Sequence, residues 1–245
     1  MKKYKFENDF AQGIVDGILQ GYKDYLGVRK EKKIELEISS AYAWVKGNHI
    51  EDAVSQKVPE FGVTYNHSKA GYAWGYLQFT QEDEKVLFII KHGMKHGTKI
   101  PSTKKRNVET NYLAKLSRIN SDATFNEIED DKEFNEQLTF DDFPLIDEEL
   151  NEEVTEISRQ HDRFFIISYT TDNNKMISEI ELLLPNPNEN VLYRVESWTE
   201  LIENSNVSID ATELDVVSGE KEPISPNQSV ADYGIEDIPE EQENE

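Results

Sequence analysis

The chain has 245 residues, of which 37% are hydrophobic and 10% aromatic, enough to build a hydrophobic core in one large domain. It contains no cysteine, which excludes a disulfide scaffold, a thiolate zinc site and a cysteine nucleophile. Its formal charge of −23 is too acidic for a protein that simply coats nucleic acid. No apolar run approaches the ~20 residues of a membrane span, and no signal-peptide pattern is present, so we expect a cytoplasmic protein without a membrane partner.

The negative charge is concentrated in two segments. Residues 1–120 carry a net charge of +6 and residues 163–203 one of −4, whereas residues 121–162 carry −14 and residues 204–245 carry −11. The acidic residues of 121–162 alternate with Phe and Leu, which is typical of a docked helical or partner-binding segment. We therefore predict a single α/β domain over residues 1–203, in which 121–162 is a helical or partly disordered insertion, followed by a mostly disordered acidic tail, 204–245.

Two amphipathic helices are predicted at the start of the chain. Residues 6–26 place apolar side chains at steps of four, which indicates a helix. Gly13, Gly17 and Gly21 share one ridge of that helix, and such a ridge favours close approach by another helix or a sheet edge, since each glycine costs ~0.8–1 kcal/mol relative to alanine. A second helix is expected to begin near residue 39 and to continue to residue 58.

The next elements in the chain have the character of strands. Residues 61–65, 72–80 and 85–91 are predicted strands, the last two joined by a polar hairpin turn. Residues 86–90 are apolar at every position, as in a central strand buried on both faces. A basic loop over 91–106, a helix over 107–119, strands over 163–169 and 175–184 and a short helix over 193–202 follow, which predicts an α/β protein with a mixed central sheet flanked by helices.

One motif carries a resemblance to a known family. Residues 47–54, Gly-Asn-His-Ile-Glu-Asp-Ala-Val, match the G-x-x-hydrophobic-E-x-x-hydrophobic pattern of the first core helix in many restriction-endonuclease-like, or PD-(D/E)XK, proteins. The order of elements over residues 39–184 is also similar to that superfamily. The resemblance implies an αβββαβ core, with the acidic segment as an insertion before the last strands.

The resemblance also implies a set of catalytic positions. Such nucleases hold Mg²⁺ with an Asp on the second strand and an acidic residue two before a Lys on the third. Glu51 matches the helix acid and Lys91 the lysine, but Ile89 stands two residues before Lys91. Asp83 and Lys85 offer a second acid-x-Lys pair on the hairpin loop, so an active enzyme would use Glu51, Asp83, Lys85 and Lys91 with Mg²⁺. We expect instead a catalytically degenerate core without a cofactor.

The basic loop is the other candidate site. Six of its residues are cations: Lys91, Lys95, Lys99, Lys104, Lys105 and Arg106. They form either a phosphate-contacting loop or a surface loop that closes on the acidic segment of the same chain. Aromatic residues at Tyr65, Tyr72, Trp74, Tyr76 and Phe79 form a base-stacking surface or, as is more usual on a strand, pack in the core and across strands. His92 and His96 would share a face only on a helix, and Gly93 and Gly97 favour a loop, so no metal site is predicted.

Three functions follow from these features. The leading hypothesis is a non-catalytic, nuclease-like protein that engages nucleic acid or a nucleic-acid-handling protein, in a bacterial, phage or mobile-element defence setting that the resemblance suggests. The first alternative is an active Mg²⁺-dependent nuclease. The second is an acidic DNA mimic or inhibitor that binds a basic protein partner.

Overall fold

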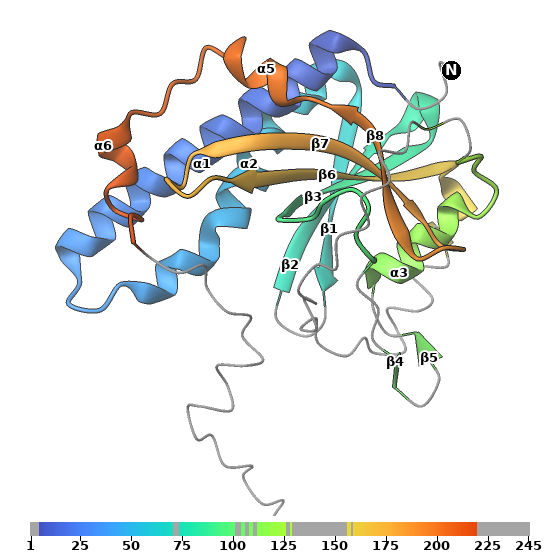
Figure 1. Ribbon diagram of the computed structural model, residues 1–245, viewed down its shortest axis with the longest axis horizontal. Coiled ribbons are helices and arrows are strands. Elements are labelled where there is room, and N and C mark those ends of the chain that lie inside the picture. Colours follow the sequence, from blue (N-terminus) through green and yellow to red (C-terminus); the bar gives the residue numbers. More distant parts are fainter. Residues whose placement is uncertain are drawn as a thin grey trace, which may run out of the picture.

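The core of the protein is a six-stranded mixed β-sheet with helices on both faces, as predicted (Figure 1). The computed structural model describes residues 5–70, 74–100, 104–105, 108–109, 112–125, 128, 156–157 and 159–219. The strands of the large sheet are β1 (Val63–Ala70), β2 (Trp74–Gln81), β3 (Val86–His92), β6 (Arg163–Thr171), β7 (Ile177–Asn186) and β8 (Val191–Ser197). Two short strands, β4 (Lys104–Lys105) and β5 (Val108–Glu109), pair separately.

The sheet has the order β1-β2-β3-β6-β7-β8. The first three strands form an antiparallel meander, and so do the last three. The two halves join where β3 pairs with β6 in parallel, from Val86 opposite Arg163 to His92 opposite Tyr169. Parallel neighbours need a crossover connection, and α3 (Tyr112–Ser117), which lies between β3 and β6 in the chain, covers one face of the sheet.

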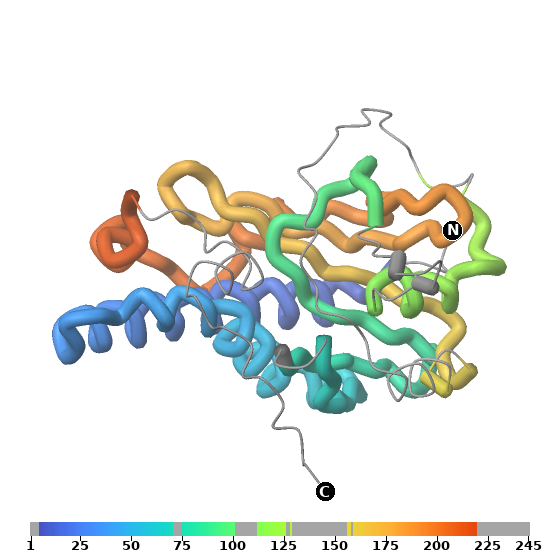
Figure 2. The backbone as a smooth tube through the Cα atoms, turned by 90° about the horizontal axis from the view of Figure 1, so that it is seen from below, coloured from blue at the N-terminus to red at the C-terminus, as the bar shows by residue number. Residues whose placement is uncertain are grey.

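The helices divide between the two faces of the sheet. On one face lie α1 (Asn8–Glu35) and α2 (Lys46–Lys57), side by side in Figure 2, and the 3₁₀ turn η2 (Ser40–Val45) leads directly into α2. On the other face lies α3 (Tyr112–Ser117). Shorter elements are η3 (Val58–Phe61), η4 (Glu82–Glu84), η5 (Arg118–Asn120), α5 (Thr199–Glu203) and α6 (Ala211–Leu214).

Strand β3 is the centre of the hydrophobic core, as its sequence predicted. Phe88 and Ile90 pack toward α1 and α2, whereas Leu87 and Ile89 pack toward α3. Successive side chains of a strand point to opposite faces, so a strand covered by helices on both faces needs an apolar residue at every position. The continuous run from residue 86 to residue 90 satisfies that requirement.

The glycine ridge of α1 is the surface on which α2 packs, which confirms that prediction. A Cβ atom added to Gly21 would lie 2.4 Å from the Cα of Ile50, and one added to Gly17 would lie 2.8 Å from a methyl group of Val54. Gly13 is similarly close to the ring of Phe61. The two helices therefore approach more closely than any side chain would allow, and this contact fixes the position of α2.

The end of the folded body differs from the sequence prediction in two ways. The expected helix over residues 193–202 is strand β8 followed by the five-residue α5. As the sheet's last strand, β8 is mostly half-buried, so its sequence lacks the clear alternation that identifies a strand.

The boundary of the acidic tail was also predicted wrongly, because residues 204–219 belong to the body. A capping box between Asp210 and Glu213 starts α6, which lies beside α1 in Figure 1. Leu214, Val216 and Val217 are buried in the core next to α1. Three apolar side chains supplied enough buried surface to order a segment that its overall composition had marked as disordered.

Parts of the predicted organisation lie outside the described residues. These parts are 220–245 of the tail and, in the insertion, 126–127, 129–155 and 158. Within the described part of the chain, no helix is both long and apolar enough to cross a membrane.

Candidate functional site

A gap between two neighbouring strands defines the candidate site. β2 and β3 pair only from Phe79 opposite Phe88 to Gln81 opposite Val86, next to their hairpin turn. Beyond these pairs, β2 continues against β1 and β3 continues against β6. The two central strands therefore separate, and backbone groups on the inner edges of the gap need other hydrogen-bond partners.

Glu51 supplies one of these partners from α2. The Leu77 N–H on β2 donates a 2.9 Å hydrogen bond to the Glu51 Oε2 atom. Glu51 is 9% exposed, and this burial raises the pKa of its carboxyl group, against the opposing effects of the Lys91 ammonium and the Leu77 hydrogen bond. The close α1–α2 contact at Gly21 and Ile50 holds the neighbouring Glu51 at this depth.

Lys91 enters the same gap from β3. Its Nζ atom lies 4.7 Å from the ring centroid of Tyr76 and 5.5 Å from that of Tyr112, within the range of cation–π attraction. The two rings are 4.9 Å apart. Burial raises the pKa of the Tyr76 hydroxyl to about 12, and burial together with the Glu51 charge raises the pKa of Tyr112 well above 10, so both stay neutral near pH 7. Lys91 thus faces one carboxyl group and two neutral rings.

Glu51, Tyr76 and Lys91 line a cleft of about 250 Å³ that is open to solvent. Trp44 in η2 and Lys46 at the start of α2 form part of its lining, as do His92 at the end of β3 and Tyr169 on β6. Glu51 is the one carboxylate among the described lining residues, against the two ammonium groups of Lys46 and Lys91. The local charge therefore favours an anion, although the whole chain is strongly acidic.

The structure brings together two of the four residues considered for catalysis. Glu51 and Lys91 meet in the gap, whereas Asp83 lies in η4 and Lys85 directly follows it, at the opposite end of the β2–β3 hairpin. Six residues of extended strand separate Lys85 from Lys91, about 20 Å. Asp83 is exposed, as expected for a hairpin turn.

The position that would carry the second acid is apolar. Ile89 is fully buried in the core beneath α3. No Asp or Glu occurs from residue 61 to residue 81 or from residue 85 to residue 108, which spans all three strands of the meander. Among the described residues, the cleft therefore lacks the pair of carboxylates that the resemblance implies for Mg²⁺, and these residues do not fit that ion.

The basic loop is attached to the sheet along its described part, residues 93–100. Gly93 N–H donates to the Tyr169 carbonyl (2.9 Å), and Gly97 N–H donates to the Leu192 carbonyl (2.8 Å). Leu192 N–H donates in return to the Thr98 carbonyl. Gly93 and Gly97 have φ of 77° and 73°, which glycine adopts without strain, so a loop replaces the helix on which His92 and His96 would share a face.

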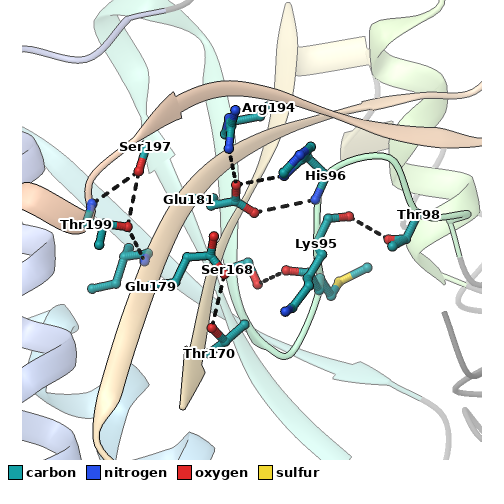
Figure 3. Close-up of polar contacts among 12 residues, drawn as sticks. Lys95, His96, Thr98, Ser168, Thr170, Glu179, Glu181, Arg194, Ser197 and Thr199 are labelled. Atoms are coloured by element: carbon teal, nitrogen blue, oxygen red, sulfur yellow. Dashed lines mark hydrogen bonds and ion pairs between the residues drawn. The ribbon is translucent and has the colours of Figure 1, made fainter. Parts of the chain in front are cut away.

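A buried carboxylate fixes the middle of this loop (Figure 3). Glu181 on β7 is 2% exposed, and its Oε1 atom lies 3.0 Å from His96 Nδ1 and 3.3 Å from Arg194 Nη1. The Ser168 hydroxyl donates to the Met94 carbonyl nearby, at 2.6 Å. His96 therefore anchors the loop, whereas the ring of His92 packs 5.0 Å from that of Tyr169.

The six predicted phosphate-contacting cations differ in their position and in how far the structure describes them. Lys95 and Lys99 are exposed on the anchored loop, and Lys91 points into the gap. Lys104 and Lys105 are described only as the backbone of β4, and Arg106 lies outside the described residues. The role predicted for the set stays a prediction.

The predicted aromatic surface is mostly core. Phe79 is fully buried and stacks on Phe88, with 5.0 Å between ring centroids, and Tyr76 is buried beneath Lys91. Tyr65 is 42% exposed. Tyr72 and the Trp74 side chain lie outside the described part. Trp44 and Tyr112 were missed, and neither has a sequence signal that separates it from an ordinary core aromatic.

Fold and site together define a mixed α/β protein in which a buried carboxyl group and a lysine occupy a cleft between two separating strands. Residues 3–232 match the model of a family of unknown function (DUF5986), and the chain belongs to that family. No curated protein and no solved structure matches the chain.

Proposed function

We propose that the protein is a non-catalytic nucleic-acid-binding protein on a restriction-endonuclease-like core, and that the cleft beside Lys91 binds the phosphodiester backbone. The order α2, β1-β2-β3, α3 and β6, with β3 parallel to β6, supports the αβββαβ part of this proposal. The resemblance assigns Glu51 to the helix acid and Lys91 to the strand lysine, and both residues line the cleft, which supports the proposal. The bacterial, phage or mobile-element defence setting stays a prediction of the resemblance.

The observation that carries the proposal is Lys91 in a cleft whose described lining contains a single carboxyl group. Phosphate contacts in nucleic-acid complexes come mainly from Lys and Arg. The Glu51 Oε2 atom accepts a hydrogen bond from the Leu77 N–H, so part of this carboxyl group is already engaged when a phosphate approaches the Lys91 ammonium. The acid-free stretches on either side add Lys69, Lys95 and Lys99 without adding negative charge.

The nuclease alternative has one supporting observation, the meeting of Glu51 and Lys91. Among the described residues it lacks the second carboxylate, because Ile89 is buried and Asp83 lies at the far end of the hairpin. We therefore favour binding without cleavage. The acidic-mimic alternative depends on segments that lie mostly outside the described residues, and it stays a prediction.

Binding of short labelled DNA and RNA, followed by fluorescence anisotropy between about 50 and 200 mM salt, tests the proposal. Lys91→Met should weaken binding to all sequences alike and reduce the slope of log K against log salt by about one. Lys57→Met is the matched control, because Lys57 is an exposed lysine at the opposite end of α2 and should not matter.

A second variant separates binding from folding. Lys91→Met alone leaves the buried Glu51 without its cation, so the double variant Glu51→Gln, Lys91→Met removes both charges while keeping an acceptor for Leu77. Absence of wild-type binding at low salt, or unchanged binding by the folded double variant, would overturn the proposal. Cleavage of plasmid or RNA with Mg²⁺ or Mn²⁺ that is lost in Glu51→Ala would overturn its non-catalytic part.

A further inference from the structure

The cleft that holds Lys91 has an apolar side that a phosphate alone does not use. Its lining includes the apolar side chains of Ala43, Trp44, Ile50, Ala70 and Ile90. A phosphate group is bound by cations and hydrogen-bond donors, whereas an apolar wall with a few polar groups is typical of a site for a flat organic ligand. In a nucleic acid, the flat and weakly polar part is the base.

Trp44 is the aromatic residue of this wall that a ligand can reach. Tyr76 and Tyr169 also line the cleft, but both are buried. The half-buried ring of His92 packs against Tyr169, with 5.0 Å between the ring centroids. Trp44 is half-buried, so part of this large side chain stays accessible at the cleft.

The position of Trp44 relative to Lys91 follows from the helical segment that carries it. Because η2 leads directly into α2, Trp44, Gly47 and Glu51 follow one another at steps of three and four and share one face, the face that lines the cleft. Glu51 is the electrostatic neighbour of Lys91. Trp44 therefore lies about 10 Å along the helix from the Glu51–Lys91 pair, with Lys46 between them.

Two exposed glycines leave space along the same cleft. Gly47 on α2 and Gly75 on β2 both line it. A Cβ atom added to Gly47 would have no described atom within 4 Å, and one added to Gly75 would come no closer than 3.9 Å, to the Ser68 carbonyl oxygen. The space that a side chain would fill at each position is thus open to a ligand.

The size of the cleft favours an unpaired strand. Its volume of about 250 Å³ lies below the ~300–1,000 Å³ of sites that enclose drug-sized molecules, so it accommodates one unit of a nucleic-acid strand. In a duplex, neighbouring bases cover both faces of each base, and a base must leave this stack before a side chain can contact its face. An aromatic side chain beside cations is the arrangement by which proteins bind single strands.

We propose that the cleft binds single-stranded nucleic acid, with an unpaired base stacked on Trp44 and the adjoining phosphate at Lys91 and Lys46. This inference rests on the proposed function, because the phosphate contact at Lys91 is common to both. It adds the class of nucleic acid that is preferred and the residue that sets the preference. Because every base has a π face, stacking on Trp44 does not require a particular sequence.

The test compares binding of a labelled single strand of mixed sequence, as DNA and as RNA, with that of the corresponding duplex by the full-length protein, using fluorescence anisotropy. Wild type should bind the single strand more tightly. Trp44→Leu should weaken single-strand binding by about 5- to 150-fold, the range for one stacked base, and leave duplex binding unchanged. Trp44→Phe keeps an aromatic ring and should retain most of the affinity. Tyr65→Leu is the matched control, because Tyr65 is 42% exposed on β1, away from the described lining of the cleft.

A second variant tests the space without removing any side chain. Gly47→Leu should narrow the cleft and weaken binding of the single strand. Gly27→Leu is its control, because Gly27 is an exposed glycine of α1 whose added Cβ also has no described atom within 4 Å. Circular dichroism checks that each variant is folded.

The outcomes separate this inference from the function on which it rests. Equal affinity for single strand and duplex, or equal losses for both in Trp44→Leu, would overturn base stacking, while weaker binding in Lys91→Met would still support the phosphate-binding cleft. A loss in Trp44→Phe as large as in Trp44→Leu, or unchanged binding by Gly47→Leu, would also overturn the inference. Absence of binding by every probe would overturn the proposed function itself.

Discussion

Replacing Gly21 by alanine should force α1 and α2 apart, although alanine is the better helix former. A Cβ at this position would lie 2.4 Å from the Ile50 Cα and 2.5 Å from the His49 carbonyl oxygen. Both atoms belong to the backbone of α2, so no side-chain rotation can relieve the contact. Restoring an ordinary separation of about 3.4 Å requires α2 to move by about 1 Å.

The expected change in the free energy of unfolding of Gly21→Ala is the balance of two opposing effects. Glycine to alanine in the middle of a helix stabilises by ~0.5–1 kcal/mol. Overpacking of a core typically costs ~1–3 kcal/mol, and here the displaced atoms are backbone, so we expect the upper part of that range. Gly21→Ala should therefore lower the free energy of unfolding by about 1–2 kcal/mol.

Gly27→Ala in the same helix is the matched control. Gly27 is exposed and has no atom within 4 Å of its added Cβ, so the variant should gain ~0.5–1 kcal/mol from helix propensity alone. Urea unfolding followed by circular dichroism measures both changes. A Gly21→Ala protein as stable as Gly27→Ala would show that α2 can move at no cost, and would remove the reason given for the fixed position of Glu51.

Three further outcomes are expected. Because the pKa of Glu51 is raised, the folded protein binds the carboxyl proton more tightly than the unfolded chain does. The contribution of Glu51 to the free energy of unfolding therefore falls as pH rises from about 4.3 through the folded pKa. The free energy of unfolding of Glu51→Gln minus that of wild type should rise over this pH range, by about 1.36 kcal/mol for each unit by which the pKa is raised. A difference in urea midpoints that does not change with pH would contradict this prediction. Glu181→Gln should lower the free energy of unfolding by about 1–3 kcal/mol and speed amide hydrogen exchange in residues 93–100, because the charged contacts of Glu181 with His96 and Arg194 are lost. Unchanged exchange would show that Glu181 does not anchor this loop. Leu214→Ala should cost about 2–4 kcal/mol in the same urea assay, whereas Leu36→Ala, 42% exposed, should change stability by less than about 0.5 kcal/mol, and equal values would show that α6 does not pack on α1.

The fold was predicted from sequence wherever the hydrophobic pattern was strong. The apolar steps of α1 and the continuous run of β3 predicted elements that the structure contains, and the three glycines predicted the close helix contact. The pattern failed at β8, where half-buried positions carry little periodicity. The composition also placed the start of the acidic tail at residue 204, although Val216 and Val217 leave room for a docking element in the sequence and are buried with Leu214 in the structure.

The candidate site was predictable only in part. A motif and an element order were sufficient to select Glu51 and Lys91, which the structure brings together. The partners of Lys91 could not be predicted, because Tyr112 reaches it only through the long crossover between β3 and β6.

Glu51 has a structural task that explains its burial without catalysis. Where β2 and β3 separate, the Leu77 N–H loses the strand partner it would have had, and an unpaired buried N–H costs about 1–3 kcal/mol. The Glu51 carboxyl group accepts that hydrogen bond, and Lys91 offsets part of the cost of burying its charge. Glu51 therefore satisfies the unpaired inner edge of β2, and Lys91 adds a cation to the lining of the same cleft, an arrangement that suits phosphate binding whether or not the site cleaves a phosphodiester.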